Sequence, residues 1–551
     1  MSYWGEWGDM IRNPRSGSGC RWKATPEGTL SYTYDAAGHV ASIQSSNANG
    51  ASAAYTYDDL NRLSAVVDNR LSGNTTTTYT YDPASNLATA TYPNGLQSMF
   101  TYDQLNRVSQ LVTPVSGYNY QRDPTGNKTS ALELNGRATI WSYDGINQLT
   151  NESISGSPSG KNGNIAYGLD AVGNRLSATS SLSGVSSGSF SYNVDDRTTS
   201  EGYDLNGETT ATGGKTYGFD SLSRLNSMNG GAVSLLYDGN GNRVSKTTNG
   251  VTTRYLIDDQ NPTGFPQVLE ELTGGVVTRT YTYGLQRISE DQIVNGGWTP
   301  SFYGYDGGGN VRQLTNSAGA LTDTYEYDAF GNKINSTGTS PNNYLYRGEQ
   351  YDGDLGLYYL RARYYNPATG RFLSRDPEDD KLYDQAAFHK YLYASGNPVN
   401  RIDPRGRPDL VETGFALEKA TIRTDLIAGA IGCGASLGFT VAEAMLAQDY
   451  SFGFLNPDGS ISGAGTAGNA AAIAGCLTTM FSRIPAASKL GVLAGWVGCI
   501  ASVVQVIQDI QQIEKDTDPA AVENDGKKAE TDLISGDFGC ALTIAGAVGA
   551  F

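Results

Sequence analysis

Several residue types that carry chemistry are scarce in this sequence. Only two histidines, His39 and His389, occur in 551 residues, which disfavours catalysis or metal binding based on histidine. The five cysteines lie far apart and form no CxxC pair. This spacing excludes a zinc knuckle and a thioredoxin-type motif, and it leaves the redox compartment open. We therefore expect no metal and no other cofactor.

Positive charge is also in short supply. The formal net charge is −17, and no basic patch stands out along the chain, so we expect no nucleic-acid partner. The first residues, MSYWGEWGDMIRNPRSG, contain acidic side chains and no apolar run of the length that a secretory signal requires. Two explanations are open: export by another route, or a chain that is a fragment of a longer protein.

Glycine and tyrosine, by contrast, are abundant. The chain has 68 glycines and 35 tyrosines, with 38% hydrophobic and 17% charged residues. The overall balance is that of a globular protein with a sizeable core. Many glycines together with many aromatic residues favour β structure that is rich in turns.

A short phrase built around Tyr-Asp recurs through the first two thirds of the chain. Clear copies are YTYDAAGHVASI from Tyr32, YTYDDLNRLSAV from Tyr55, YTYDPASNLATA from Tyr79, FTYDQLNRVSQL from Phe100 and WSYDGINQLTNE from Trp141. Early copies are spaced by about 20 to 24 residues, which is the length of two short strands and two turns. Each copy therefore predicts one β-hairpin, with alternating strands on both sides of an Asp-containing turn.

The aspartate of each copy is expected to be structural. Its carboxylate can accept hydrogen bonds from backbone N–H groups two or three residues later, which stabilises a turn. The alternative interpretation is that exposed tyrosines of the repeats bind a ligand such as a glycan. A single hairpin cannot bury its apolar face, so many copies must continue into one long, twisted sheet.

These copies resemble the YD-repeat, or RHS-repeat, proteins of bacteria, which have relatives in insecticidal toxin complexes and in the animal teneurins. The resemblance covers roughly residues 30–406 and rests on about a dozen copies of the phrase. It implies a spiralling β-sheet that closes into a hollow shell around a cargo. The chain has fewer repeats than a full shell of the family, so we expect a partial or multi-chain version.

The repeat pattern ends near Tyr344, where the sequence YLYRGEQYDGDLGLYYLRARYYNPATGRFLSRDP begins. This stretch, with the later segment that ends at Arg407, resembles the RHS-associated core. From Tyr358 to Tyr365 the side chains alternate as in one strand, with Arg361 and Arg363 on the same face. The sequence NPATG then predicts a turn at residues 366–370.

In several members of the family this core is an intramolecular aspartyl protease that severs the C-terminal cargo. Matched by motif, the resemblance implies that Arg363, Asp376 and Asp403 form such a site. The chemistry is reasonable, because two carboxylates held close share a proton and can act as general base and general acid. A nearby arginine can position one of them.

The pattern departs from the family at the expected cleavage position. The family often continues DPxGL, whereas Arg407 replaces that leucine here and Pro408 follows. A bond to proline has no N–H and restricts the preceding residue, which disfavours cleavage. The structural alternative also stays open, since Asp-Pro commonly opens turns and arginines stack on tyrosines. His389 is expected to be a packed or surface residue.

Composition breaks abruptly after Arg407. The last 144 residues contain one tyrosine, no histidine, seven Lys/Arg and 16 Asp/Glu, and no Walker-type loop, which disfavours nuclease or kinase chemistry. Apolar runs at 426–442 and 490–508 are predicted to be helical and are borderline in length for spanning a bilayer. A membrane-active toxin, a soluble helical bundle or shell plug, and a catalytic toxin are all open interpretations. The four cysteines there are expected to be buried.

We therefore expect a mainly β fold: a segment of unknown role at 1–29, a YD-repeat shell at 30–343, the RHS-associated core at 344–407 and an α-helical effector-like domain at 408–551. The expected function is toxin delivery, with self-cleavage near Asp403–Gly406 as the single enzymatic activity. The chain would be secreted or on the cell surface, with its own C-terminal domain as cargo. Further expected partners are a secretion apparatus, an immunity protein, and a target membrane or surface glycans. The alternative is an adhesion or carbohydrate-binding protein with membrane-associating helices.

Overall fold

The computed structural model describes residues 22–377, 389–407 and 410–411. The chain divides into two units, Met1–Leu417 and Glu418–Phe551, and all described residues lie in the first. Most of them are in β-strands, which confirms the mainly β prediction. The helical domain predicted at 408–551, apart from residues 410–411, and all five cysteines lie outside the described residues. No helix in the described part is long and apolar enough to cross a membrane.

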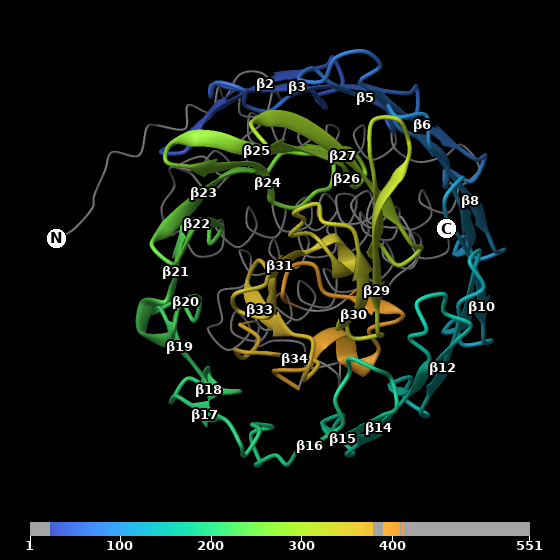
Figure 1. Cartoon of the computed structure of the whole chain (residues 1–551), viewed down its shortest axis with the longest axis vertical. Coiled ribbons are helices and arrows are strands. Elements are labelled where there is room, and N and C mark those ends of the chain that lie inside the picture. The colour runs from blue at the N-terminus through green and yellow to red at the C-terminus, as the bar shows by residue number, and fades with distance from the viewer. Residues whose placement is uncertain (1–21, 378–388, 408–409, 412–551) are drawn as a thin grey trace, which may run out of the picture. The chain divides into compact units, whose positions relative to one another are not determined.

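The first sheet has 16 antiparallel strands, and each strand pairs with its neighbours in sequence. In Figure 1 the strands follow one another along an arc from β2 to β16. They are β1 (Trp22–Thr25), β2 (Gly28–Tyr34), β3 (Val40–Ser45), β4 (Ser52–Tyr57), β5 (Leu63–Asp68), β6 (Thr76–Tyr81), β7 (Leu87–Thr91), β8 (Gln97–Tyr102), β9 (Val108–Val112), β10 (Gly117–Arg122), β11 (Lys128–Glu133), β12 (Ala138–Tyr143), β13 (Leu149–Ser155), β14 (Gly163–Leu169), β15 (Arg175–Ser180) and β16 (Gly188–Ser189).

The second sheet continues the same pattern with 14 antiparallel strands. They are β17 (Gly202–Tyr203), β18 (Thr209–Thr212), β19 (Lys215–Phe219), β20 (Leu225–Met228), β21 (Val233–Tyr237), β22 (Arg243–Thr248), β23 (Val251–Asp258), β24 (Gln267–Thr273), β25 (Val276–Tyr283), β26 (Arg287–Val294), β27 (Gly297–Tyr305), β28 (Val311–Thr315), β29 (Leu321–Tyr327) and β30 (Lys333–Thr337). A 3-10 helix, η1 (Asn229–Gly231), follows β20.

The described residues after β30 form two small sheets and two 3-10 helices. Four antiparallel strands make the first sheet and two make the second. The elements are η2 (Tyr346–Gly348), β31 (Gln350–Asp352), β32 (Leu357–Leu360), β33 (Arg363–Asn366), β34 (Arg371–Phe372), η4 (Tyr393–Gly396), β35 (Arg401–Ile402) and β36 (Leu410–Val411). In Figure 1, β31, β33 and β34 are drawn inside the arc of the first sheet.

Each residue of the repeated phrase has a definite part in the hairpin, as the copy at 57–62 illustrates. The Asp58 Oδ1 atom accepts hydrogen bonds from the backbone N–H groups of Leu60 and Arg62, both at 2.9 Å. Asn61 takes the left-handed conformation with φ of 61°, and the register shifts beside Tyr57, as in a type I turn followed by a bulge. The predicted hairpin is confirmed. The aspartate accepts from the N–H groups two and four residues later, where two or three residues later was predicted.

In six copies the tyrosine of the phrase links its hairpin to an earlier one. Its hydroxyl donates a hydrogen bond, at 2.6 to 3.0 Å, to the backbone carbonyl of the first residue in an earlier return strand. The pairs are Tyr57 to Val40, Tyr81 to Leu63, Tyr102 to Leu87, Tyr143 to Lys128, Tyr237 to Leu225 and Tyr305 to Arg287. The phrase therefore specifies both the turn and the contact between successive repeats.

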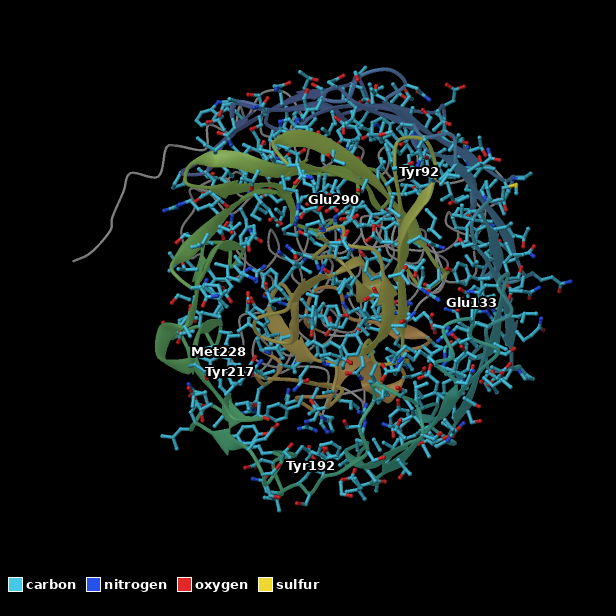
Figure 2. The ribbon with its side chains drawn as sticks, viewed as in Figure 1. Tyr92, Glu133, Tyr192, Tyr217, Met228 and Glu290 are labelled. Atoms are coloured by element: carbon cyan, nitrogen blue, oxygen red, sulfur yellow. The ribbon has the colours of Figure 1, made fainter. Side chains whose placement is uncertain are left out.

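The second sheet packs against the first through one shared core and a series of polar contacts. Buried tyrosines, leucines and valines of both sheets form a single cluster. The Arg312 Nη2 atom donates to both carboxylate oxygens of Glu133 at 3.0 Å, and Figure 2 shows Glu133 on the first sheet. Phe330, in the turn between β29 and β30, packs edge-on against Tyr167 at 5.1 Å between ring centres. The first sheet thus forms one wall of the core and the second sheet the other.

A buried ion pair joins the four-stranded sheet to the second sheet. Arg243, on β22, contacts the carboxylate of Asp352, on β31, and both side chains are 1% exposed. Lys246 contacts the same carboxylate at 2.8 Å. Although burial opposes the charge of Asp352, these two cations hold its pKa below the usual range. Removal of either partner would leave a buried charge uncompensated, so this pair fixes the position of the segment that follows.

We predict that Tyr81→Phe lowers the free energy of unfolding by about 1 kcal/mol, because it removes one hydrogen bond between repeats. The ring stays in place, so the contact with the Arg62 guanidinium, 4.3 Å from the ring centre, is kept. Urea unfolding measures the change. Leu60→Ala, at a turn residue 66% exposed, is the control and should leave stability unchanged. Equal effects of the two variants would contradict the role given to the hydroxyl.

A second prediction concerns pH. Asp258 accepts a hydrogen bond from the Tyr32 hydroxyl at 2.9 Å, and burial raises the pKa of its carboxyl to about 6. A carboxyl whose pKa is higher in the folded than in the unfolded state binds more protons when folded. The contribution of Asp258 to the free energy of unfolding is therefore complete below about pH 4 and is lost as the pH rises toward about 6.

Asp258→Asn should remove this dependence, because an amide accepts the same hydrogen bond without titrating. The melting temperature of the wild-type chain should fall more steeply between about pH 4 and pH 6 than that of the variant, by an amount equivalent to about 2 kcal/mol. Thermal unfolding followed by circular dichroism over this range measures the difference. Parallel pH profiles for the two proteins would show that Asp258 does not carry the effect.

Candidate functional site

The stretch 355–377 contains a tight hairpin that the sequence did not predict. Leu360 of β32 pairs with Arg363 of β33, so the single strand predicted from Tyr358 to Tyr365 is wrong. Arg361 and Ala362 form the turn, and Arg361 has a φ of 60°. This left-handed conformation usually belongs to glycine, asparagine or aspartate, so an arginine there carries no turn signal.

The next turn agrees with the sequence. The Gly370 N–H donates to the Asn366 carbonyl at 2.9 Å, and Gly370 has a φ of 72°. The turn predicted at 366–370 is therefore confirmed. It returns the chain to β34, which pairs with β33 and supplies Phe372. The Phe372 ring lies 3.6 Å from the Arg363 guanidinium carbon and so covers one side of that cation.

The three residues predicted to form a protease site lie together. The Arg363 Nη2 atom contacts the Asp376 Oδ2 atom at 2.8 Å and the Asp403 Oδ2 atom at 3.2 Å. Because both oxygens contact one nitrogen, they can be no farther apart than the sum of these two distances. The side chains are 3%, 17% and 2% exposed for Arg363, Asp376 and Asp403, respectively. Their catalytic roles stay a prediction.

Backbone contacts hold the two aspartates from different parts of the chain. Asp376 follows β34, and its N–H donates to the Lys390 carbonyl at 2.9 Å. That carbonyl also accepts from the Arg363 Nη1 atom at 3.1 Å. Asp403 follows β35, which begins only five residues after η4. Arg363 is therefore the common partner that brings the two carboxylates to one place.

Three charged side chains meet at this site. Two carboxylates and one guanidinium lie together in a largely buried position. Burial opposes the guanidinium charge and lowers the pKa of Arg363, although Asp403 and Asp376 act in the opposite direction. Two carboxylates held beside one cation are the groups that general acid–base hydrolysis requires. The arrangement can thus hold one carboxylate as a base and the other as an acid.

A peptide group lies next to these side chains. The Arg407 N–H donates to the Asp403 Oδ1 atom at 2.8 Å, and the Arg407 carbonyl lies 3.4 Å from the Arg363 Nη2 atom. This carbonyl belongs to the bond between Arg407 and Pro408. The carbonyl of the Arg407–Pro408 bond therefore lies near the side chain that holds the two aspartates. This is the bond at which the sequence departs from the family pattern.

Sequence reasoning missed the residue that makes this approach feasible. Gly406 has a φ of 62°, and a Cβ atom there would lie 2.4 Å from the Leu360 carbonyl oxygen and 2.8 Å from the Arg363 nitrogen. Only glycine fits such a close approach of two backbones. The glycine of DPRG was the available signal, but its role depends on a contact with residues 43 or more positions earlier.

Space for water adjoins the site. A cavity borders Asp403 and is lined in part by Arg287, Arg347, Glu349 and Arg361. Hydrolysis needs a water molecule near the carboxylates, and this cavity lies beside one of them. Within the described ranges, no group of three histidine, cysteine or acidic residues is placed to hold a metal ion.

His389 is a packed residue, as predicted. Its Nε2 atom lies 2.7 Å from the Asn174 Oδ1 atom, and its side chain is near the Arg371 guanidinium. Burial, with a further contribution from Arg371, lowers the pKa of His389 to about 4. The imidazole is therefore neutral near pH 7 and links the core segment to the first sheet.

Curated proteins similar to the chain include two large bacterial proteins. The tRNA3(Ser)-specific nuclease WapA of Bacillus spizizenii is 35% identical over 268 residues, which are 46% of this chain and 11% of WapA. The tRNA nuclease WapA of Bacillus subtilis strain 168 is 34% identical over 268 residues, which are again 46% of this chain and 11% of that protein. The chain thus spans about a tenth of the length of these relatives.

Solved structures share the fold. The crystal structure of TcdB2-TccC3 superposes with a TM-score of 0.57 and 20% identity, covering 69% of this chain and 22% of that one. The Photorhabdus luminescens Tc holotoxin pore superposes with a TM-score of 0.58 and 18% identity, covering 71% and 22%. At these identities the likeness concerns the fold alone.

The family comparison covers most of the described residues. The Teneurin YD-shell model matches residues 15–151 and 129–399, which together make up more than half of the chain. The match includes both large sheets and Asp376, and it ends four residues before Asp403. From its repeats, its two hairpin sheets and this match, the chain is a member of the YD-shell family, also known as the RHS-repeat family.

Proposed function

We propose that this chain is the shell portion of a toxin-delivery protein and that it cuts itself after Arg407. The observation that carries this proposal is the position of the Arg407 peptide. Its N–H contacts Asp403, and its carbonyl lies beside Arg363, which holds both aspartates. Cleavage there would separate the repeat sheets from residues 408–551, which lie beyond the family match.

The proposed reaction is the hydrolysis of one amide bond. One aspartate is ionised and the other is protonated. The ionised carboxylate takes a proton from water while the water oxygen bonds to the Arg407 carbonyl carbon, and the Arg363 guanidinium stabilises the charge that develops on the carbonyl oxygen. The protonated carboxyl then gives its proton to the Pro408 nitrogen as the carbon–nitrogen bond breaks. The products are a carboxylate at Arg407 and a prolyl amine at Pro408.

Proline at the leaving position makes this reaction slow, but it does not prevent it. The amide nitrogen carries no hydrogen, so no donor of the site can hold it through its own N–H. The residues before the bond must then supply the orientation. A slow cut suits a reaction that each molecule performs once.

Residues 408–551 are the proposed cargo of the partial shell that the sheets belong to. Their two apolar runs, at 426–442 and 490–508, favour a membrane-active effector. The same composition gives no support for the tRNA nuclease activity named for WapA. The whole system would include an export apparatus, an immunity protein for the producing cell and a target membrane, and the protein would act outside the cell or at its surface.

We predict that Asp376→Asn and Asp403→Asn each abolish the cut, because an amide cannot exchange the proton that the reaction needs. Intact-mass analysis of purified wild-type chain should give one fragment that ends at Arg407 and one that begins at Pro408. Each variant should give a single mass for residues 1–551. Asp354→Asn is the control, since that side chain is 44% exposed and pairs with Lys246; it should be cut as the wild type is. An uncut wild type, or cut variants, would overturn the proposal.

The cargo is tested separately. Expression of residues 408–551 in a bacterium should slow growth and depolarise the membrane, because the apolar runs would insert into the bilayer. Expression of residues 1–407 from the same promoter is the control and should do neither. A membrane-potential dye measures the change. If growth stops without depolarisation, the cargo is a toxin of another kind; if neither changes, the toxin proposal for this segment is lost.

A further inference from the structure

A turn of three residues contacts four successive backbone carbonyls before the proposed cut. The turn is 361–363, and the segment it contacts is 404–407. The contacts run in order along both: Arg361 Nη1 to the Pro404 carbonyl, Ala362 N–H to the Arg405 carbonyl at 3.2 Å, Arg363 Nε to the Gly406 carbonyl at 2.6 Å and Arg363 Nη2 to the Arg407 carbonyl at 3.4 Å. All donors belong to the turn and all acceptors to the segment.

This contact depends on the backbone of the segment. Carbonyl groups are present in every residue, so the turn holds the segment without selecting its side chains. Arg405 and Arg407 are exposed, although the Arg405 guanidinium carbon lies 5.3 Å from the Phe265 ring centre, whereas Pro404 and Gly406 are buried. Position 406 does require glycine, because a Cβ atom there would collide with the Leu360 carbonyl. One backbone N–H and two arginine side chains thus hold a peptide through its carbonyl groups, and the same chain supplies that peptide.

Arg361 is itself fixed from several directions. Its Nη1 atom pairs with the Glu349 Oε1 atom at 2.9 Å, and both side chains are 14% exposed. Its Nε atom donates to the Pro266 carbonyl at 3.3 Å, and its guanidinium carbon lies 5.2 Å from the Phe265 ring centre. A side chain held in this way can place a carbonyl with little loss of conformational entropy. Arg361 lies too far along the segment to act on the Arg407 carbonyl, which contacts Arg363.

We propose that the 361–363 turn is a binding site for polypeptide backbone that sets which bond is cut, and that Arg361 is its positioning residue. This inference rests on the proposed self-cleavage. By holding the Pro404 carbonyl, Arg361 fixes one end of the segment, and Arg363 fixes the other. The Arg407 carbonyl then has one place to lie, beside the two aspartates, even though the proline nitrogen that follows offers no hydrogen bond.

The same turn would retain the product. Hydrolysis converts the Arg407 carbonyl into a carboxylate at the position that faces the Arg363 guanidinium. A neutral acceptor is thereby replaced by an anion, and an ionised acceptor binds an arginine more strongly than a neutral one. The carboxylates of Asp376 and Asp403 oppose this anion, so retention of the new C-terminus depends also on the contacts that the turn keeps with the carbonyls of residues 404–406.

The test compares Arg361→Ala, Arg361→Lys and a control, Arg254→Ala, whose guanidinium also pairs with a carboxylate but is 50% exposed and lies elsewhere on the second sheet. Freshly refolded chains are followed over time by intact mass. Arg361→Ala should be cut at least about tenfold more slowly, with products that end at more than one residue near 407. Arg361→Lys, which keeps a cationic donor, should restore a single end. The control should match the wild type.

If Arg361 had a merely structural role, Arg361→Ala would slow the cut without changing its position, and Arg361→Lys would not restore the rate. An unchanged single cut position in Arg361→Ala, or an unchanged rate, would overturn the proposal. A second measurement does not depend on self-cleavage. In the Asp376→Asn chain, the bond after Arg405 should resist trypsin while the turn holds the segment, and adding Arg361→Ala should speed cutting there by at least about tenfold. Equal trypsin rates in the two chains would contradict the backbone-binding site. A wild-type chain that is not cut after Arg407, but whose bond after Arg405 resists trypsin, would contradict only the proposed self-cleavage.

Discussion

The hydrogen bond from a repeat tyrosine to an earlier return strand is the contact on which the large sheets depend. It recurs from Tyr57 to Tyr305 with the same acceptor position. The adjoining aspartate closes the turn, so the two residues of each phrase give a hairpin both its shape and its neighbour. Since each hairpin alone is unstable, repeated linkage of this kind is what allows a sheet of 16 strands to form.

The same combination of strand pairing and buried charge organises the segment at the end of the repeats. Arg243 with Asp352 joins the small sheet to the large one, and Arg363 joins Asp376 to Asp403. A buried ion pair contributes little net stability, but its loss is costly, so such pairs enforce one arrangement. In this protein that arrangement leaves a peptide carbonyl beside two carboxylates, which turns a structural contact into a candidate reaction site.

Much of this could be predicted from the sequence, and the reasons are local. Tyr57, Asp58 and Asn61 act within one hairpin, and their spacing alone predicts the turn. The grouping of Arg363, Asp376 and Asp403 was predicted from the resemblance to the family. Residue spacing alone could not predict it, because Arg363 and Asp403 are 40 positions apart in the sequence. The turn at Arg361 was missed because an arginine with positive φ has no local signature. The role of Gly406 was missed because it depends on a long-range backbone contact.

The central claim is that one chain supplies the carboxylates, the arginine and the bond that is cut. The most direct measurement is the rate of appearance of the fragment that ends at Arg407, recorded in refolded wild-type protein over a hundredfold range of concentration. A site that is filled by its own chain predicts a first-order rate that does not change with dilution. A rate that rises in proportion to protein concentration would mean that one molecule cuts another, and it would contradict the account.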